Sequence, residues 1–84
     1  MNLISAELDA LQKDFHQWFL TWIARVRKSE GLHSTQEALE WIASGASVKG
    51  QRIPVSTLAS WANGRNTDPA TSNLLPVFRF LTGF

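Results

Sequence analysis

The stretch Ile53-Pro-Val-Ser-Thr-Leu-Ala-Ser-Trp-Ala-Asn-Gly-Arg65 decides the expected fold, because it reads as a short helix closed by an Asn-Gly turn. Its apolar residues recur at helical spacing over about three turns; they are Leu58, Ala59, Trp61 and Ala62. Gly64 stands where a chain that leaves a helix needs a residue free to adopt a positive φ. Small polar residues, Ser56 and Ser60, occupy the remaining face. The pattern therefore predicts a short helix that is buried on one side.

Before this stretch, residues from about Leu3 to Ser29 predict one long amphipathic helix, which Gly31 ends. Its apolar residues fall within one broad sector at about 100° per residue; they are Leu8, Leu11, Phe15, Trp18, Phe19, Trp22, Ile23 and Val26. Part of this stripe must face the core. The aromatic members Phe15, Trp18, Phe19 and Trp22 are more often core than interface, and the interface alternative stays open.

A second helix is predicted from the capping box Ser34-Thr-Gln-Glu37, in which Ser34 accepts from the Glu37 amide and Glu37 reaches back. It ends near Gly45, and its apolar residues are Ala38, Leu39, Ile42 and Trp41. A polar, glycine-containing loop between 46 and 53 then leads to Pro54, which is tolerated in the first turn of the next helix.

The final helix carries the apolar residues Leu74, Leu75, Val77, Phe78 and Leu81. Asp68-Pro69 or Ser72 are the candidate caps, and Pro76 favours a late start at Ser72 or Asn73, because a proline costs little in the first turn. No alternating strand-like run is present. The sequence predicts an all-α fold of four to five helices in a single domain, 1–84, with an N-terminal helical extension (1–18) before the body (19–84).

The composition narrows the classes of function. The chain lacks cysteine, so disulfides and thiolate metal sites are excluded. His16 and His33 are far apart and have no ligand pattern, which favours structural roles and predicts no metal and no cofactor. No nucleophile–base set or glycine-rich phosphate loop indicates an enzyme. The apolar runs are too short to cross a bilayer, so we expect a cytoplasmic protein, nucleoid-associated if it binds DNA.

The charge is unevenly distributed along the chain. The net charge is +1, but residues 1–24 carry one lysine against three acidic residues, and residues 25–84 carry seven Lys and Arg residues against four acidic ones. A basic body behind an acidic leading segment suits a DNA-binding protein, although ordinary surface charge explains it nearly as well.

The order of elements resembles the lambda-repressor-like (Cro/repressor, XRE-type) helix-turn-helix family. The resemblance runs from about Trp22 to Gly83 and is carried by Thr35-Gln-Glu-Ala-Leu39, by Ser56-Thr-Leu-Ala-Ser-Trp-Ala-Asn-Gly-Arg65 and by Asn73-Leu-Leu75. It implies a helix-turn-helix bundle in which the third helix enters the major groove of operator DNA, as in transcriptional repressors of bacterial or phage type.

Carried over by position, the resemblance assigns candidate site residues. The candidates for base contact are Val55, Ser56, Ala59 and Ser60. The candidates for phosphate contact are Gln36, Lys49, Arg52, Thr57, Asn63 and Arg65. The first set contains no Arg, Gln or Asn for bidentate base contacts, so we expect a homodimer on two half-sites to supply specificity.

Two alternative functions also fit the sequence, that of an antitoxin and that of an anti-regulator. The chain can act as an antitoxin-like or anti-regulator module that binds a protein partner through the aromatic surface of the first helix, with little or no DNA binding. The candidate interface residues for a partner or a second subunit are Phe15, Trp18 and Phe84. For Gln36 and Asn63, helix capping and turn formation are about as well supported as phosphate contact.

Overall fold

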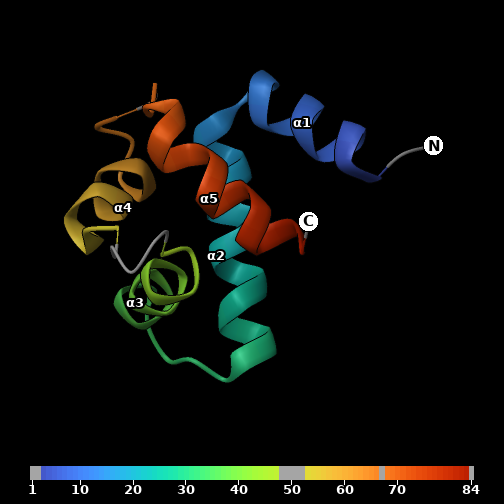
Figure 1. The fold of residues 1–84 in the computed structure, drawn as a ribbon. Helices are drawn as coiled ribbons and strands as arrows, with labels where there is room; N and C mark the ends of the chain where they lie inside the picture. Colours follow the sequence, from blue (N-terminus) through green and yellow to red (C-terminus); the bar gives the residue numbers. More distant parts are fainter. Residues whose placement is uncertain (1–2, 48–52, 67, 84) are drawn as a thin grey trace.

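The computed structural model describes residues 3–47, 53–66 and 68–83, and all regular structure in these parts of the chain is helical (Figure 1). The helices are α1 (Leu3–Lys13), α2 (Phe15–Glu30), α3 (Thr35–Gly45), α4 (Val55–Ala62) and α5 (Thr71–Thr82). The radius of gyration is 12.0 Å, which matches the value of about 12 Å expected for a compact domain of this length. The expectation of an all-α fold is confirmed.

The predicted single helix from Leu3 to Ser29 is wrong, because the chain breaks at Asp14. Asp14 has an extended φ of −158° and its side chain accepts a hydrogen bond from the amide of Gln17 (3.1 Å), so it caps a new helix. Figure 1 shows that α1 then extends away from α3 and α4 on the far side of α2. The apolar spacing continues across the break because only one non-helical residue is inserted there.

The ends of α2 and α3 agree with the sequence signals. Gly31 ends α2 with φ +66°, and the Leu32 amide donates to the Arg27 carbonyl oxygen (2.9 Å). At the start of α3, the Glu37 amide donates to Ser34 Oγ (3.2 Å). The Glu37 carboxylate reaches back one residue further than expected, since it accepts from the His33 amide (3.3 Å).

α1, α3 and α4 lie against α2, and α5 lies against α3 and reaches α2 through Phe78, which stacks on Trp18. The fully buried large side chains of the core come from four helices: Phe19, Ile42, Leu58, Trp61 and Val77. Burial of this much apolar surface supplies the main stabilisation of a small domain without disulfides. Three residues of the predicted apolar sets are exposed instead of buried: Leu8, Trp41 and Leu75.

The last helix, α5, begins at Thr71, one residue before the expected range, and neither Ser72 nor Asp68 caps it. Its N-cap is Ala70, whose carbonyl oxygen accepts from the Leu74 amide (2.9 Å), and no side chain caps this end. Pro76 lies inside the helix, where it has no amide hydrogen to donate to the preceding turn. α5 ends at Gly83, with φ +73°.

Candidate nucleic-acid interface

Two buried side chains fix the orientation of α4. Leu58 and Trp61 have no exposed surface. The ring of Trp61 stands nearly edge-on to the rings of Phe15 and Phe19, at centroid distances of 5.5 Å in both cases. Such edge-to-face pairs add to the stabilisation from burial. Because these contacts prevent α4 from rotating about its axis, they determine which of its side chains face outward.

The outward face of α4 carries small polar side chains at helical spacing. Ser56 and Asn63 are exposed, and Ser60 between them is half-buried. The Ser60 hydroxyl donates to the Ser56 carbonyl oxygen (3.1 Å), one turn earlier in the same helix. This stripe lies opposite Leu58 and Trp61, so α4 presents a low-relief polar surface.

The four base-contact candidates differ in accessibility. Ser56 is exposed, and Ser60 is half-buried with its hydroxyl engaged as above. Val55 and Ala59 are partly buried and pack against the core. Thr57, a candidate for phosphate contact, is also half-buried. The structure thus brings all five onto α4, and Ser56 is the most accessible of them.

The turn after α4 presents Arg65 to solvent. Gly64 has the expected positive φ (+79°), and Asn63 Oδ1 accepts from the Arg65 amide (3.0 Å). The imidazole of His16 ties this turn to α2, because its Nε2 donates to the Ala62 carbonyl oxygen (2.9 Å). Asn63 therefore helps to form the turn, which is the role expected for it as the alternative to phosphate contact. The residue is exposed.

The remaining phosphate candidates lie before α4. Gln36 is exposed in the first turn of α3, where its side-chain amide donates to Glu40 Oε1 (3.3 Å). Lys49 and Arg52 lie outside the described residues.

Two of the candidate interface residues, Phe15 and Trp18, are buried within the chain itself. Phe15 and Trp18 have 8% and 4% of their surface exposed. Trp18 stacks against Phe78 of α5, with centroids 5.9 Å apart. The core interpretation of these two residues agrees with this burial, and Phe84 lies outside the described residues.

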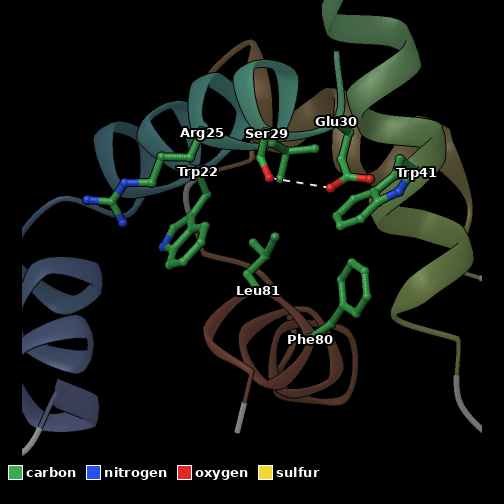
Figure 2. Close-up of a pocket in the computed structure, with 8 residues that line it drawn as sticks. Trp22, Arg25, Ser29, Glu30, Trp41, Phe80 and Leu81 are labelled. Atoms are coloured by element: carbon green, nitrogen blue, oxygen red, sulfur yellow. Dashed lines mark hydrogen bonds between the residues drawn. The ribbon is translucent and has the colours of Figure 1, made fainter. Parts of the chain in front are cut away.

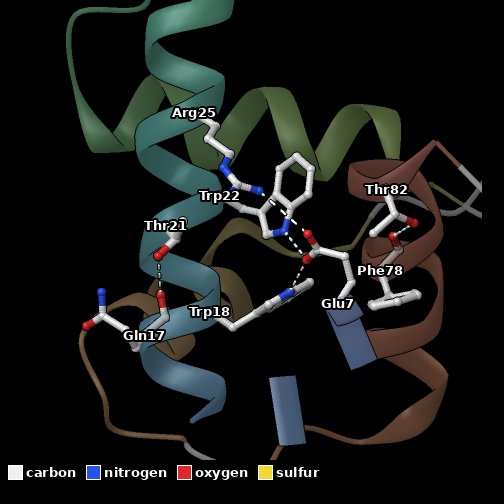
Figure 3. A network of polar contacts seen from close by, with 8 residues as sticks. All are labelled: Glu7, Gln17, Trp18, Thr21, Trp22, Arg25, Phe78 and Thr82. Atoms are coloured by element: carbon white, nitrogen blue, oxygen red, sulfur yellow. Dashed lines mark hydrogen bonds and ion pairs between the residues drawn. The ribbon is translucent and has the colours of Figure 1, made fainter. Parts of the chain in front are cut away.

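A polar cluster that the sequence analysis missed joins α1 to α2 (Figure 3). One oxygen of Glu7 accepts hydrogen bonds from the indole nitrogens of Trp18 (2.9 Å) and Trp22 (3.1 Å). The other oxygen lies 3.7 Å from Arg25, whose guanidinium also lies over the Trp22 ring at 4.8 Å. The partners are 11 to 18 positions apart, so no local pattern in the sequence connects them.

Other kinds of site find little support in the described residues. In these parts of the chain, no group of three or more His, Asp or Glu side chains is placed to hold a metal ion. None of the helices described has the length and apolar character needed to cross a membrane. Comparisons with protein-family models, with curated proteins and with solved structures found no match.

Proposed function

We propose that this chain is a DNA-binding transcriptional regulator of the lambda-repressor-like type, in which α3 and α4 form the helix-turn-helix and α4 docks in the major groove. The observation that carries the proposal is the outward face of α4. A helix that Leu58 and Trp61 anchor on one side, and that carries small polar groups on the other, can present those groups to base edges in the major groove.

The distribution of charge around α4 supports contact with phosphate. No acidic residue occurs in the sequence between Glu40 and Asp68, whereas this segment holds Lys49, Arg52 and Arg65. Cationic side chains that flank a groove-binding helix neutralise phosphates and release counterions, which supplies much of the affinity for duplex DNA.

In this proposal Ser56 and Ser60 donate to or accept from base edges, while Val55 and Ala59 offer apolar contact to a thymine methyl group. Gln36, Thr57, Asn63 and the three cations contact the backbone. The four residues that contact bases include no Arg, Gln or Asn that could form a bidentate contact. A homodimer on two half-sites therefore supplies the specificity. Occupancy of an operator then regulates transcription by blocking or recruiting polymerase in the cytoplasm.

Selection from a duplex library tests the proposal. The purified chain is incubated with random-sequence duplex DNA at two salt concentrations, and bound DNA is separated by gel shift and sequenced. The expected result is salt-sensitive binding with enrichment of one short motif, repeated if the protein binds as a dimer. Absence of any retained DNA at the lower salt concentration contradicts the proposal.

A second candidate function is a protein-interaction module that has lost DNA affinity. It is favoured by the half-buried state of Val55 and Ala59 and by the engagement of the Ser60 hydroxyl with its own helix. In the same library experiment this candidate requires no binding at either salt concentration. Of the residues expected to meet such a partner, Phe15 and Trp18 are buried and Phe84 lies outside the described residues. Leu8 of α1, which was not among them, is an exposed apolar residue that could make this contact.

A further inference from the structure

A pocket of about 340 Å³ lies where α2, α3 and α5 meet, on a different surface from the outward face of α4 (Figure 2). Its apolar lining comes from all three helices: Trp22, Val26, Trp41, Phe80 and Leu81. Pockets of about 300 Å³ and above are large enough to hold a small organic molecule.

Three aromatic rings surround this space. Trp41 and Phe80 lie with their ring centroids 4.9 Å apart at 48°, and Trp22 stands across the pocket from them (Figure 2). Trp41 keeps 36% of its surface exposed even though a buried tryptophan would add more to stability. The faces of aromatic rings attract cations, and several rings around one space form the kind of cage that binds alkylated ammonium groups.

The charge at the pocket also favours a cation. The Glu30 carboxylate stands at its edge, accepts from the Ser29 hydroxyl (3.4 Å) and makes no ion pair with any described residue. Glu30 is the last residue of α2, where the helix dipole is negative, so a carboxylate there opposes helix stability. The carboxylate supplies a negative charge at this end of the pocket. Arg27 and Lys28 lie in the same turn of α2, and Arg27 donates to the His33 carbonyl oxygen (3.0 Å).

One cation of the protein lines the same pocket without filling it. The guanidinium of Arg25 points away from the enclosed space, toward α1 (Figure 2), and lies 3.7 Å from Glu7. It covers part of the Trp22 ring at 4.8 Å, which shows that this ring already accepts a cation on one side. In Figure 2, Leu81 stands between Trp22 and Phe80, and these side chains and Trp41 line the pocket together.

We propose that this pocket binds a small organic cation, an alkylated ammonium compound whose alkyl groups contact the three aromatic rings and whose charge faces Glu30. The apolar walls bind the body of the ligand, and the carboxylate selects it over a neutral molecule of the same shape. The inference does not depend on DNA binding, because none of the pocket residues belongs to α4.

Choline and dimethylbutanol, its uncharged isostere with carbon in place of the quaternary nitrogen, are the probes. Each is titrated into the ¹⁵N-labelled chain while the four indole N–H signals are followed by NMR. Choline is expected to shift the Trp22 and Trp41 signals saturably, with the fully buried Trp61 unaffected, and to bind about fivefold or more tightly than dimethylbutanol.

Matched variants separate the pocket from general charge effects. Glu30→Gln is expected to weaken choline binding about fivefold, whereas Asp9→Asn, which removes the same charge from the exposed face of α1, leaves it unchanged. Trp41→Leu, at an exposed position that should not prevent folding, is expected to abolish saturation. Equal affinity for the two probes, an unchanged affinity in Glu30→Gln, or no saturable shift at about 50 mM choline overturns the proposal.

Discussion

α1 and α4 both lie against α2, but different physical contacts hold them there. α4 inserts the fully buried Leu58 and Trp61 into the core, and its segment between Val55 and Ala62 contains no charged residue. α1 has no buried side chain among those described, and Glu7 holds it through hydrogen bonds to two indole groups. α4 is therefore part of the core, whereas α1 is attached to it through the polar contacts of Glu7 and the partly buried Leu11.

This difference bears on function. A helix that is anchored through one apolar face can vary its outward residues without loss of the fold, which is what a DNA-reading helix requires. A helix attached through one carboxylate and one partly buried leucine, Leu11, can detach while the remaining bundle stays folded. Substitutions at the buried residues of α4 should therefore lower the stability of the whole chain, whereas loss of the α1 contacts should affect α1 alone.

The largest effect is expected for Trp61→Ala. Removal of the buried indole leaves a cavity between Phe15 and Phe19, and the free energy of unfolding should fall by about 4 kcal/mol, measured by urea denaturation. Trp61→Phe should cost much less, because the indole nitrogen of Trp61 has no hydrogen-bond partner and its removal relieves an unsatisfied buried group. A loss as large in Trp61→Phe as in Trp61→Ala would contradict this account, because phenylalanine keeps most of the buried ring and lacks the unpaired nitrogen.

The next effect is expected for Glu7→Ala, which should weaken the attachment of α1 by about 2 kcal/mol. It leaves the Trp18 indole nitrogen, in a residue only 4% exposed, without its acceptor. The Arg25 ion pair adds little, since that side chain is 55% exposed and screened by solvent. Hydrogen exchange should show faster amide exchange in α1 and unchanged exchange in α4.

Asp9→Ala is the matched control for this prediction, because it removes an exposed carboxylate from the same helix. Its exchange rates should equal those of the unaltered chain. Equal acceleration in α1 and α4 of Glu7→Ala would mean that α1 is integral to the core, which contradicts the comparison.

Gly45→Ala tests a third kind of contact, the close approach of the α3 backbone to α5. A methyl group at this position would overlap the ring of Phe80. The overlap should outweigh the gain in helix propensity and destabilise the chain by about 1 kcal/mol, measured by thermal unfolding. Combination with Phe80→Leu should remove most of the penalty, whereas strict additivity would show that the ring does not cause it.

An effect on stability of similar small size is expected for His16→Ala. It removes the hydrogen bond that Nε2 donates to the Ala62 carbonyl oxygen, which joins α2 to the end of α4. The free energy of unfolding should fall by about 1 kcal/mol. Urea denaturation measures this loss, and His33→Ala, at an exposed position, is the control. Equal losses in both variants would assign no particular role to the tie at His16.

Local signals in the sequence predicted most of the helix ends. The capping box at Ser34 and the positive φ of Gly31 and Gly64 depend on residues adjacent in the chain, and the structure confirms them. The break at Asp14 was missed because the apolar period passes through it, although Asp14 followed by Gln17 is itself a capping pattern. The capping hydrogen bond of Asp14 therefore ends one helix and starts the next, although the apolar spacing alone predicts a continuous helix.

The arrangement of the surfaces was less accessible to sequence analysis. The contacts of Glu7 with Trp18 and Trp22, and of Gly45 with Phe80, join different helices, and no local pattern specifies such pairs. The candidate base-contact residues were assigned to the expected helix, but their burial depends on the rotation of α4 about its axis. That rotation is set by Trp61 against Phe15 and Phe19, which lie more than 40 positions earlier.

The most direct test of the proposed DNA docking compares two arginine-to-alanine substitutions, each of which removes one positive charge. Fluorescence anisotropy of a labelled duplex is measured with Arg65→Ala, next to α4, and with Arg79→Ala, on the exposed side of α5. The expected result is about tenfold weaker binding and a shallower salt dependence for Arg65→Ala alone. Equal affinities of the two variants, or no binding of duplex by the unaltered chain at low salt, would contradict docking through α4.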